Sequence, residues 1–346
     1  MPVMTGKSGF YRRSHGPAVD SGFFKGGMDV NNTAMDMYSG FSLREGGRFY
    51  GQDMDRSLVR ETEYYKLLQH ELEELGGGNV DISIRDVRKN NGIYRKACTV
   101  RFGGAPIAPT IYLEPFYDHY LKGEAVSESA QNIINYCKEK TPTVTLPENF
   151  FREFGTIRDR LGIKLIGTTR NQALLQDVPH VDFEGLSAVF YYLLRENSLG
   201  NGMIMVRNVD LERWNMTVQE LYQSALRTCP QMLPPVFRPL SEILNMLQPT
   251  GEGELYLLTN EGALYGASVI LYPGILQEAA SYINGDYFVL PSSVHEVILL
   301  PDNGEDPGEL LQIVREINHT QVSEEEVLID GVFRYHAGDP SVVRVA

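Results

Sequence analysis

Hydrophobic positions in the first structured part of the chain follow first a helical and then a strand period. From Ser57, apolar residues at helical spacing predict one helix, which a run of three glycines ends at 76–78. Next, VDISIRDVRK and IYRKACTVRF flank Asn90-Asn91-Gly92, and an Asn-Gly pair between β-prone runs predicts a hairpin. IAPTIYLEP supplies a third strand, and helices are expected around 116–121 and 127–138. Residues 57–141 should therefore form an α-β-β-β-α-α unit. The face predicted for the first helix comprises Leu58, Tyr65, Leu68, Leu72 and Leu75.

We expect residues 142–346 to form a larger α+β unit, and Pro142 and Pro147 mark the predicted boundary before it. Strands separated by short turns alternate with single helices, which favours layered, mainly antiparallel sheets with helices, an α+β fold. No strand is followed by G-x-G-x-x-G, so a dinucleotide-binding fold is disfavoured. The expected elements, in order, are a helix at 148–161, a strand at 163–167, paired strands at 186–196 and 202–208, helices at 216–229 and 238–247, the apolar runs GELYLLTN and GASVILYPG, a helix at 275–284, strands at 286–293 and 295–302, and a helix from Pro307.

Residues 1–56 differ from both units because they show no sustained period of two or 3.6. The segment is rich in Gly, Met and aromatic residues, and disordered tails are usually poor in aromatic residues. We expect an extended N-terminal arm that lies on its own subunit or docks on a neighbouring subunit or partner. Its predicted anchors are Phe23, Phe24, Phe41, Phe49 and Tyr50.

Charge and composition restrict the partners and the compartment. The 346 residues are 42% hydrophobic and 22% charged, with a net charge of -14, which disfavours nucleic acid and anionic membrane surfaces. The basic residues Lys7, Arg12, Arg13 and Lys25 are too widely spaced for a phosphate patch. Three dispersed cysteines form neither a disulfide framework nor a zinc pattern, and no apolar run resembles a signal peptide or membrane span. We expect a cytoplasmic protein that has no cofactor or metal.

The stretch LPSSVHEV concentrates the residue types of hydrolytic catalysis. Ser292, Ser293, His295 and Glu296 lie within five positions. In an extended strand Ser293 and His295 share a face, roughly 6.6 Å apart, whereas Glu296 points the opposite way and could not orient the histidine. No G-x-S-x-G turn is present. A strand that fills a sheet is therefore the favoured interpretation, and a polar cluster that lines a pocket is the alternative.

Other polar positions have simpler structural explanations. The turn Lys89 to Gly92 should place its amides at an exposed tip, as a tight hairpin demands. Asn208 and Asn260 follow apolar strands and should satisfy local backbone groups. Ser323 and Glu326 form a capping box that predicts a short helix, so the carboxylates at 324–326 should form its solvated first turn and not a cation site.

Several motifs in one order resemble an uncharacterised bacterial family, a domain of unknown function seen in anaerobic gut bacteria. The resemblance covers roughly residues 58–336, so the arm lies outside it. It implies a cytosolic bacterial protein but no established activity, and therefore no catalytic residues to transfer. The chain departs from the family pattern at Ile329-Asp330, where Ser-Asp is expected. The motifs are KNNG at 89–92, APTIYLEP at 108–115, LTN at 258–260, GASVILYPG at 266–274, LPSSVHEVILLP at 290–301 and NHTQVSEEEVL at 318–328.

Two functions follow from the sequence. A non-enzymatic interaction or assembly protein with the arm as docking element is favoured, because exposed apolar groups usually mark interfaces. The alternative is a hydrolase or small-ligand-binding protein with a pocket near Ser293 and His295. A protein partner or self-association is expected, and an enzyme is the less favoured class.

Overall fold

The computed structural model describes residues 59–103, 105, 108–141, 150–196, 200–243 and 254–346. The predicted arm with its five aromatic anchors, and the predicted boundary at Pro142 and Pro147, lie outside these residues. The described chain forms two compact units, one made of 59–182 with 187–228 and the other of 183–186 with 229–346. This partition differs from the sequence-based boundary near 142, which stays a prediction.

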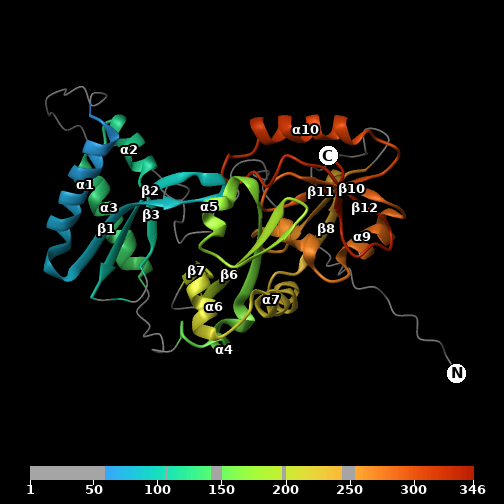
Figure 1. The fold of residues 1–346 in the computed structure, drawn as a ribbon. Coiled ribbons are helices and arrows are strands. Elements are labelled where there is room, and N and C mark those ends of the chain that lie inside the picture. Colours follow the sequence, from blue (N-terminus) through green and yellow to red (C-terminus); the bar gives the residue numbers. More distant parts are fainter. Residues whose placement is uncertain (1–58, 104, 106–107, 142–149, 197–199, 244–253) are drawn as a thin grey trace. The chain divides into compact units, whose positions relative to one another are not determined.

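The N-terminal part of the first unit has the predicted α-β-β-β-α-α order (Figure 1). Its sheet has the strand order β1-β2-β3, and β1 pairs antiparallel with β2 from Val80↔Phe102 to Arg88↔Tyr94. The hairpin prediction is therefore confirmed. The elements are α1 (Glu61–Gly76), η2 (Gly77–Asn79), β1 (Val80–Arg88), η3 (Asn90–Gly92), β2 (Tyr94–Phe102), β3 (Thr110–Tyr112), α2 (Glu114–Leu121) and α3 (Val126–Lys140).

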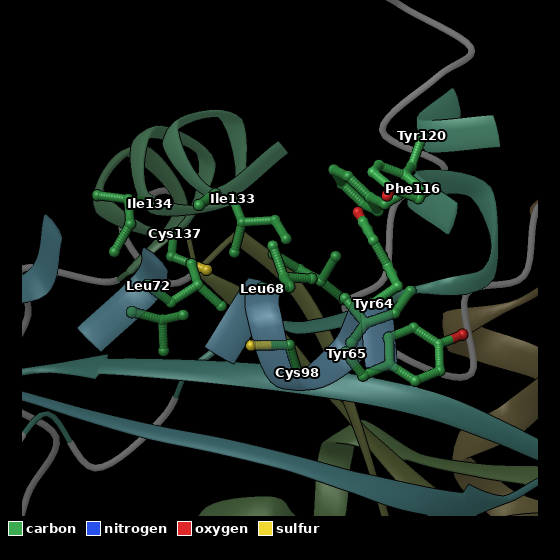
Figure 2. Close-up of a cluster of buried hydrophobic side chains, with 14 residues drawn as sticks. Tyr64, Tyr65, Leu68, Leu72, Cys98, Phe116, Tyr120, Ile133, Ile134 and Cys137 are labelled. Atoms are coloured by element: carbon green, nitrogen blue, oxygen red, sulfur yellow. The ribbon is translucent and has the colours of Figure 1, made fainter. Parts of the chain in front are cut away.

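Helices α1 and α3 and alternate residues of the sheet enclose one apolar core (Figure 2). The buried stripe of α1 runs through Tyr64, Leu68 and Leu72, which are four residues apart and so share a face. The predicted face included Leu75 and omitted Tyr64, and both choices were wrong. Leu75 is 41% exposed, because it lies in the last turn before the helix ends at Gly76.

Two of the three cysteines belong to this core. Cys98 on β2 and Cys137 on α3 are fully buried free thiols, and Cys229 on α7 is buried too. Burial raises the pKa of the Cys98 thiol and raises that of Cys137 to about 12, so both stay protonated and behave as small apolar side chains.

The rest of the first unit contains a sheet with the strand order β4-β6-β5, and β7 also pairs with β6. The helix predicted at 148–161 is replaced, in its described part, by single helical turns. Leu161 already belongs to β4, whose seven residues are all buried, so burial in the sheet outweighs helix propensity. The elements are α4 (Phe154–Ile157), η4 (Arg158–Arg160), β4 (Leu161–Gly167), η5 (Thr169–Asn171), α5 (Gln172–Leu175), β5 (His180–Phe183), β6 (Leu186–Glu196), β7 (Gly200–Met205), α6 (Asn208–Trp214) and α7 (Val218–Met232). Of these elements, the end of β5, the start of β6 and residues 229–232 of α7 belong to the second unit.

The second unit is built on a sheet with the order β13-β12-β10-β11-β9-β8 (Figure 1). Helix α10 begins as predicted, because the Asp306 side chain accepts a hydrogen bond from the Glu309 amide. Leu310 and Val314 of α10 pack on Phe288 of β10. The elements are β8 (Pro235–Pro239), α8 (Leu240–Ile243), β9 (Tyr256–Asn260), η6 (Gly266–Leu271), α9 (Ile275–Ile283), β10 (Tyr287–Pro291), β11 (Val297–Pro301), α10 (Pro307–Thr320), β12 (Phe333–Tyr335) and β13 (Val343–Arg344).

Both units combine helices with mainly antiparallel sheets, so the predicted α+β class is confirmed. Within the described ranges, no helix has the length and apolar character needed to cross a bilayer.

Candidate functional site

The four candidate catalytic residues lie in the loop between β10 and β11, not in a strand. Strand β10 ends at Pro291 and β11 begins at Val297, so the strand predicted from His295 was wrong at its start. Local hydrogen bonds close the loop instead. The Ser293 hydroxyl donates to Glu296 Oε1 at 2.6 Å and accepts from the His295 backbone amide at 3.0 Å. Ser292, next to them, is only partly buried.

The imidazole of His295 is buried and held from outside its own loop. Nδ1 lies 2.9 Å from the Ala263 carbonyl oxygen and 3.3 Å from the Tyr265 amide nitrogen. We assign the proton to Nδ1, which then donates to Ala263, because that contact is the shorter one. The ring also stacks on Tyr265, with the centroids 5.4 Å apart. The histidine is only 5% exposed.

The carboxylate beside His295 is Glu326, which the sequence analysis did not connect with it. Nε2 of His295 and Oε1 of Glu326 are 3.8 Å apart. Residues 324–326 form a turn, so the short helix predicted from Ser323 was wrong. Ser323 donates to Glu326 Oε2 at 2.9 Å, and the Val294 amide donates to the Glu326 carbonyl at 2.9 Å. The turn is thereby hydrogen-bonded to the His295 loop.

The segment after β9 forms the other wall of the site. Asn260 Oδ1 accepts from the amides of Gly262 and Leu264, both at 3.1 Å, and its Nδ2 donates to the Leu264 carbonyl at 2.8 Å. The predicted local role of Asn260 is confirmed. Ala263 (φ 46) and Tyr265 (φ 50) adopt the left-handed backbone region, which is strained for residues other than glycine.

Gly266 allows this wall to approach the His295 loop closely. A Cβ at this position would lie 2.1 Å from Thr259 Oγ1 and 2.3 Å from the His295 carbonyl oxygen. The same two groups form a hydrogen bond of 2.7 Å to each other. Only a residue without a side chain fits here, so the glycine that opens GASVILYPG is a packing requirement.

The approach of His295 to Glu326 is an arrangement that can exchange a proton. Neither candidate serine has a hydrogen bond to the imidazole, and the Ser293 hydroxyl is engaged by Glu296 and by backbone, so a serine–histidine relay is not assembled. Burial raises the pKa of Glu296, and the hydrogen bond from Ser293 opposes that rise. Among the described residues, no group of three His, Cys, Asp or Glu side chains could hold a metal ion.

A second polar cluster lies at the turn between β1 and β2, which the sequence placed at an exposed tip. That expectation was wrong, because Lys89 and Asn90 are only 8% and 6% exposed. Asn171 of η5 accepts from the Asn91 amide at 2.8 Å and donates to Asn91 Oδ1 at 3.1 Å. The Lys89 ammonium donates to the Tyr112 hydroxyl at 2.8 Å. The tip is thus packed against a distant segment of the same unit.

Asn208 also differs from its expected local role. Its side chain donates to the carbonyl of Gln176, a residue 32 positions earlier in the chain, at 2.9 Å. Asn208 therefore makes a long-range hydrogen bond, whereas Asn260 bonds to backbone groups of its own loop.

The fold and the two polar clusters define an α+β protein of two units whose buried loops are fixed by long-range hydrogen bonds. The chain belongs to DUF5688, a family of unknown function, which matches residues 61–337. The resemblance to a family of unknown function is thereby confirmed, and the bacterial origin stays a prediction. Searches of curated proteins and of solved structures gave no match.

Proposed function

We propose that the protein is a non-enzymatic assembly protein that associates with further copies of itself through its N-terminal arm, residues 1–56. The main support is that the residues of the candidate active site are buried and hydrogen-bonded within the protein. His295 and Ser293 are only 5% and 6% exposed; the imidazole contacts the Ala263 carbonyl, and the Ser293 hydroxyl is hydrogen-bonded within its own loop. Such groups hold a fold together, whereas a catalytic or binding site needs groups that a ligand can reach.

The composition of the arm supports the same proposal. Its aromatic side chains are typical of interface cores, and the arm lies outside the part of the chain that matches the family. The alternative, a hydrolase or ligand-binding protein, has less support because the imidazole has no hydrogen bond to either candidate serine.

The experiment is a measurement of solution mass by light scattering over a dilution series. The full chain is compared with a full-length variant in which Phe23, Phe24, Phe41, Phe49 and Tyr50 are changed to serine. We expect the unchanged chain to be an oligomer and the variant a monomer with the same melting temperature. A monomeric full chain at its highest soluble concentration, or an unchanged mass for the variant, would overturn the proposal.

A further inference from the structure

Helix α10 has one apolar face, which is only partly buried. This face packs into the sheet through Leu310 and Val314, which are 7% and 5% exposed. Ile313 and Ile317, one turn apart, lie along one edge of this face and are 51% and 41% exposed. A surface helix normally buries its apolar face against the core. The α10 stripe, defined as Ile313 and Ile317, is therefore a candidate contact surface.

The stripe lies in the most acidic part of the second unit. Residues 302–326 contain eight acidic residues and one basic residue, so their net charge of -7 is half of the -14 carried by the whole chain. Glu309 and Glu316, both exposed, occupy positions next to the stripe on α10. An apolar centre with an acidic rim suits a partner that offers apolar and basic side chains together.

The first half of the arm has that composition. Residues 1–27 contain four basic residues and one acidic residue, a net charge of +3, within a chain that is strongly acidic overall. Aromatic pairs stand beside the charges, at Phe10-Tyr11 before Arg12 and at Phe23-Phe24 before Lys25. Residues 28–58, which join this half to the described chain, are numerous enough for residues 1–27 to reach a neighbouring copy.

We propose that the α10 stripe receives residues 1–27 of the arm of a second copy, with Phe23 and Phe24 on the isoleucines and Lys25 beside Glu309 or Glu316. This inference rests on the proposed function and adds the surface that would receive the arm.

Helix α1 offers a comparison, since Leu67 and Leu75 are 47% and 41% exposed. Residues 60–76, which include α1, have five acidic and two basic residues, a net charge of -3, so the charge match is weaker there.

The test compares full-length chains by dilution and light scattering. In the double variant Ile313→Ser/Ile317→Ser, we expect the dissociation constant of the assembly to rise about tenfold or more, as for loss of interface anchors. The matched control Leu67→Ser/Leu75→Ser, which also replaces two aliphatic side chains of similar exposure by serine, should change it less than about twofold. Added salt should weaken the unchanged assembly, because the contact pairs opposite charges.

A chemical readout identifies the contact directly. Carbodiimide joins a lysine to a carboxylate that it touches, so mixed isotope-labelled and unlabelled chains should give Lys25–Glu309 or Lys25–Glu316 crosslinks between copies. The absence of both crosslinks from an assembled sample would overturn the inference.

The outcomes separate the two proposals. If the five arm substitutions abolish assembly and the α10 substitutions leave it unchanged, the arm docks elsewhere and only the inference fails. If the α1 control weakens assembly as much as the α10 variant does, the α10 stripe is not a specific receptor. A monomeric unchanged chain overturns both proposals together.

Discussion

Two short polar connections between antiparallel strands, 89–93 and 292–296, are stabilised in different ways. The first is a tight turn held by side chains, because Asn171 bonds to Asn91 and Lys89 donates to the Tyr112 hydroxyl. The second is tied to two distant segments, the one after β9 and the one around Glu326, through the His295 ring and backbone. Contacts with distant segments, and not the local turn chemistry, should therefore decide how much each connection contributes to stability.

The largest effect is expected at Gly266, where the segments around His295 approach most closely. Gly266→Ala places a methyl group 2.1 Å from Thr259 Oγ1 and 2.3 Å from the His295 carbonyl oxygen. The segments that contain Thr259 and His295 must then move apart, so we expect a loss of about 3 kcal/mol or more in the free energy of unfolding, measured by urea denaturation. The control Gly285→Ala meets no atom within 4 Å and should change stability by less than about 0.5 kcal/mol. Equal effects at both glycines would contradict this view.

His295→Ala tests whether the imidazole is a brace. It removes the ring that contacts Ala263 and stacks on Tyr265, and it leaves buried polar groups unpaired. We expect the unfolding free energy to fall by about 2–4 kcal/mol. His70→Ala is the control, because that side chain is 68% exposed. A stable variant with an unchanged melting temperature would favour the pocket interpretation of this region.

Asn171→Ala tests the hydrogen bonds by which Asn171 holds the hairpin turn. It removes the reciprocal hydrogen bonds with Asn91 and a third bond to the Gly167 carbonyl at 2.9 Å. We expect a loss of about 1–3 kcal/mol, less than at Gly266, by chemical denaturation. Gln131→Ala, which removes one exposed hydrogen bond on α3, should change stability by less than about 0.5 kcal/mol. A loss at Asn171 larger than that at Gly266 would reverse the proposed ranking.

The smallest effect is a pH dependence that arises at Glu296. Burial raises the pKa of this carboxyl in the folded state, so folding favours its protonated form. Its contribution is present below the ordinary Glu pKa, about 4.3, and is lost as the pH rises through the raised value. Glu296→Gln keeps an acceptor for Ser293 and does not titrate. The variant should therefore gain stability relative to the unchanged chain as the pH rises from about 4 to 7. A constant difference over that range would show that Glu296 titrates normally.

Several features of the two units could be predicted from the sequence. Local signals worked where neighbouring residues determine the result, as at the Asn-Gly hairpin, the Asp306 cap and the Asn260 brace. The helix predicted at 216–229 forms as α7, and reciprocal hydrogen bonds between Thr217 and Glu220 cap its first turn.

Prediction failed where a distant segment decides the outcome. Ser323 and Glu326 have a helix-start pattern, yet the structure forms a turn in which Glu326 lies beside His295. Likewise, Asn171 is 80 positions from Asn91 and carries no local mark of its role. The cluster of Ser293, His295 and Glu296 was found as a set of residues, but its geometry depends on Ala263, Tyr265 and Glu326.

The three buried cysteines give each unit a reporter of its own opening. Thiol reagents attack the thiolate, so Cys98 and Cys137 in the first unit, and Cys229 in the second, should react only when their surroundings open. The labelling rate of each cysteine would then report the free energy of local opening around it, and the rates in the two units could be compared without introducing new cysteines. Destabilised variants of the His295 region should speed the reaction of Cys229 first, because both belong to the same unit.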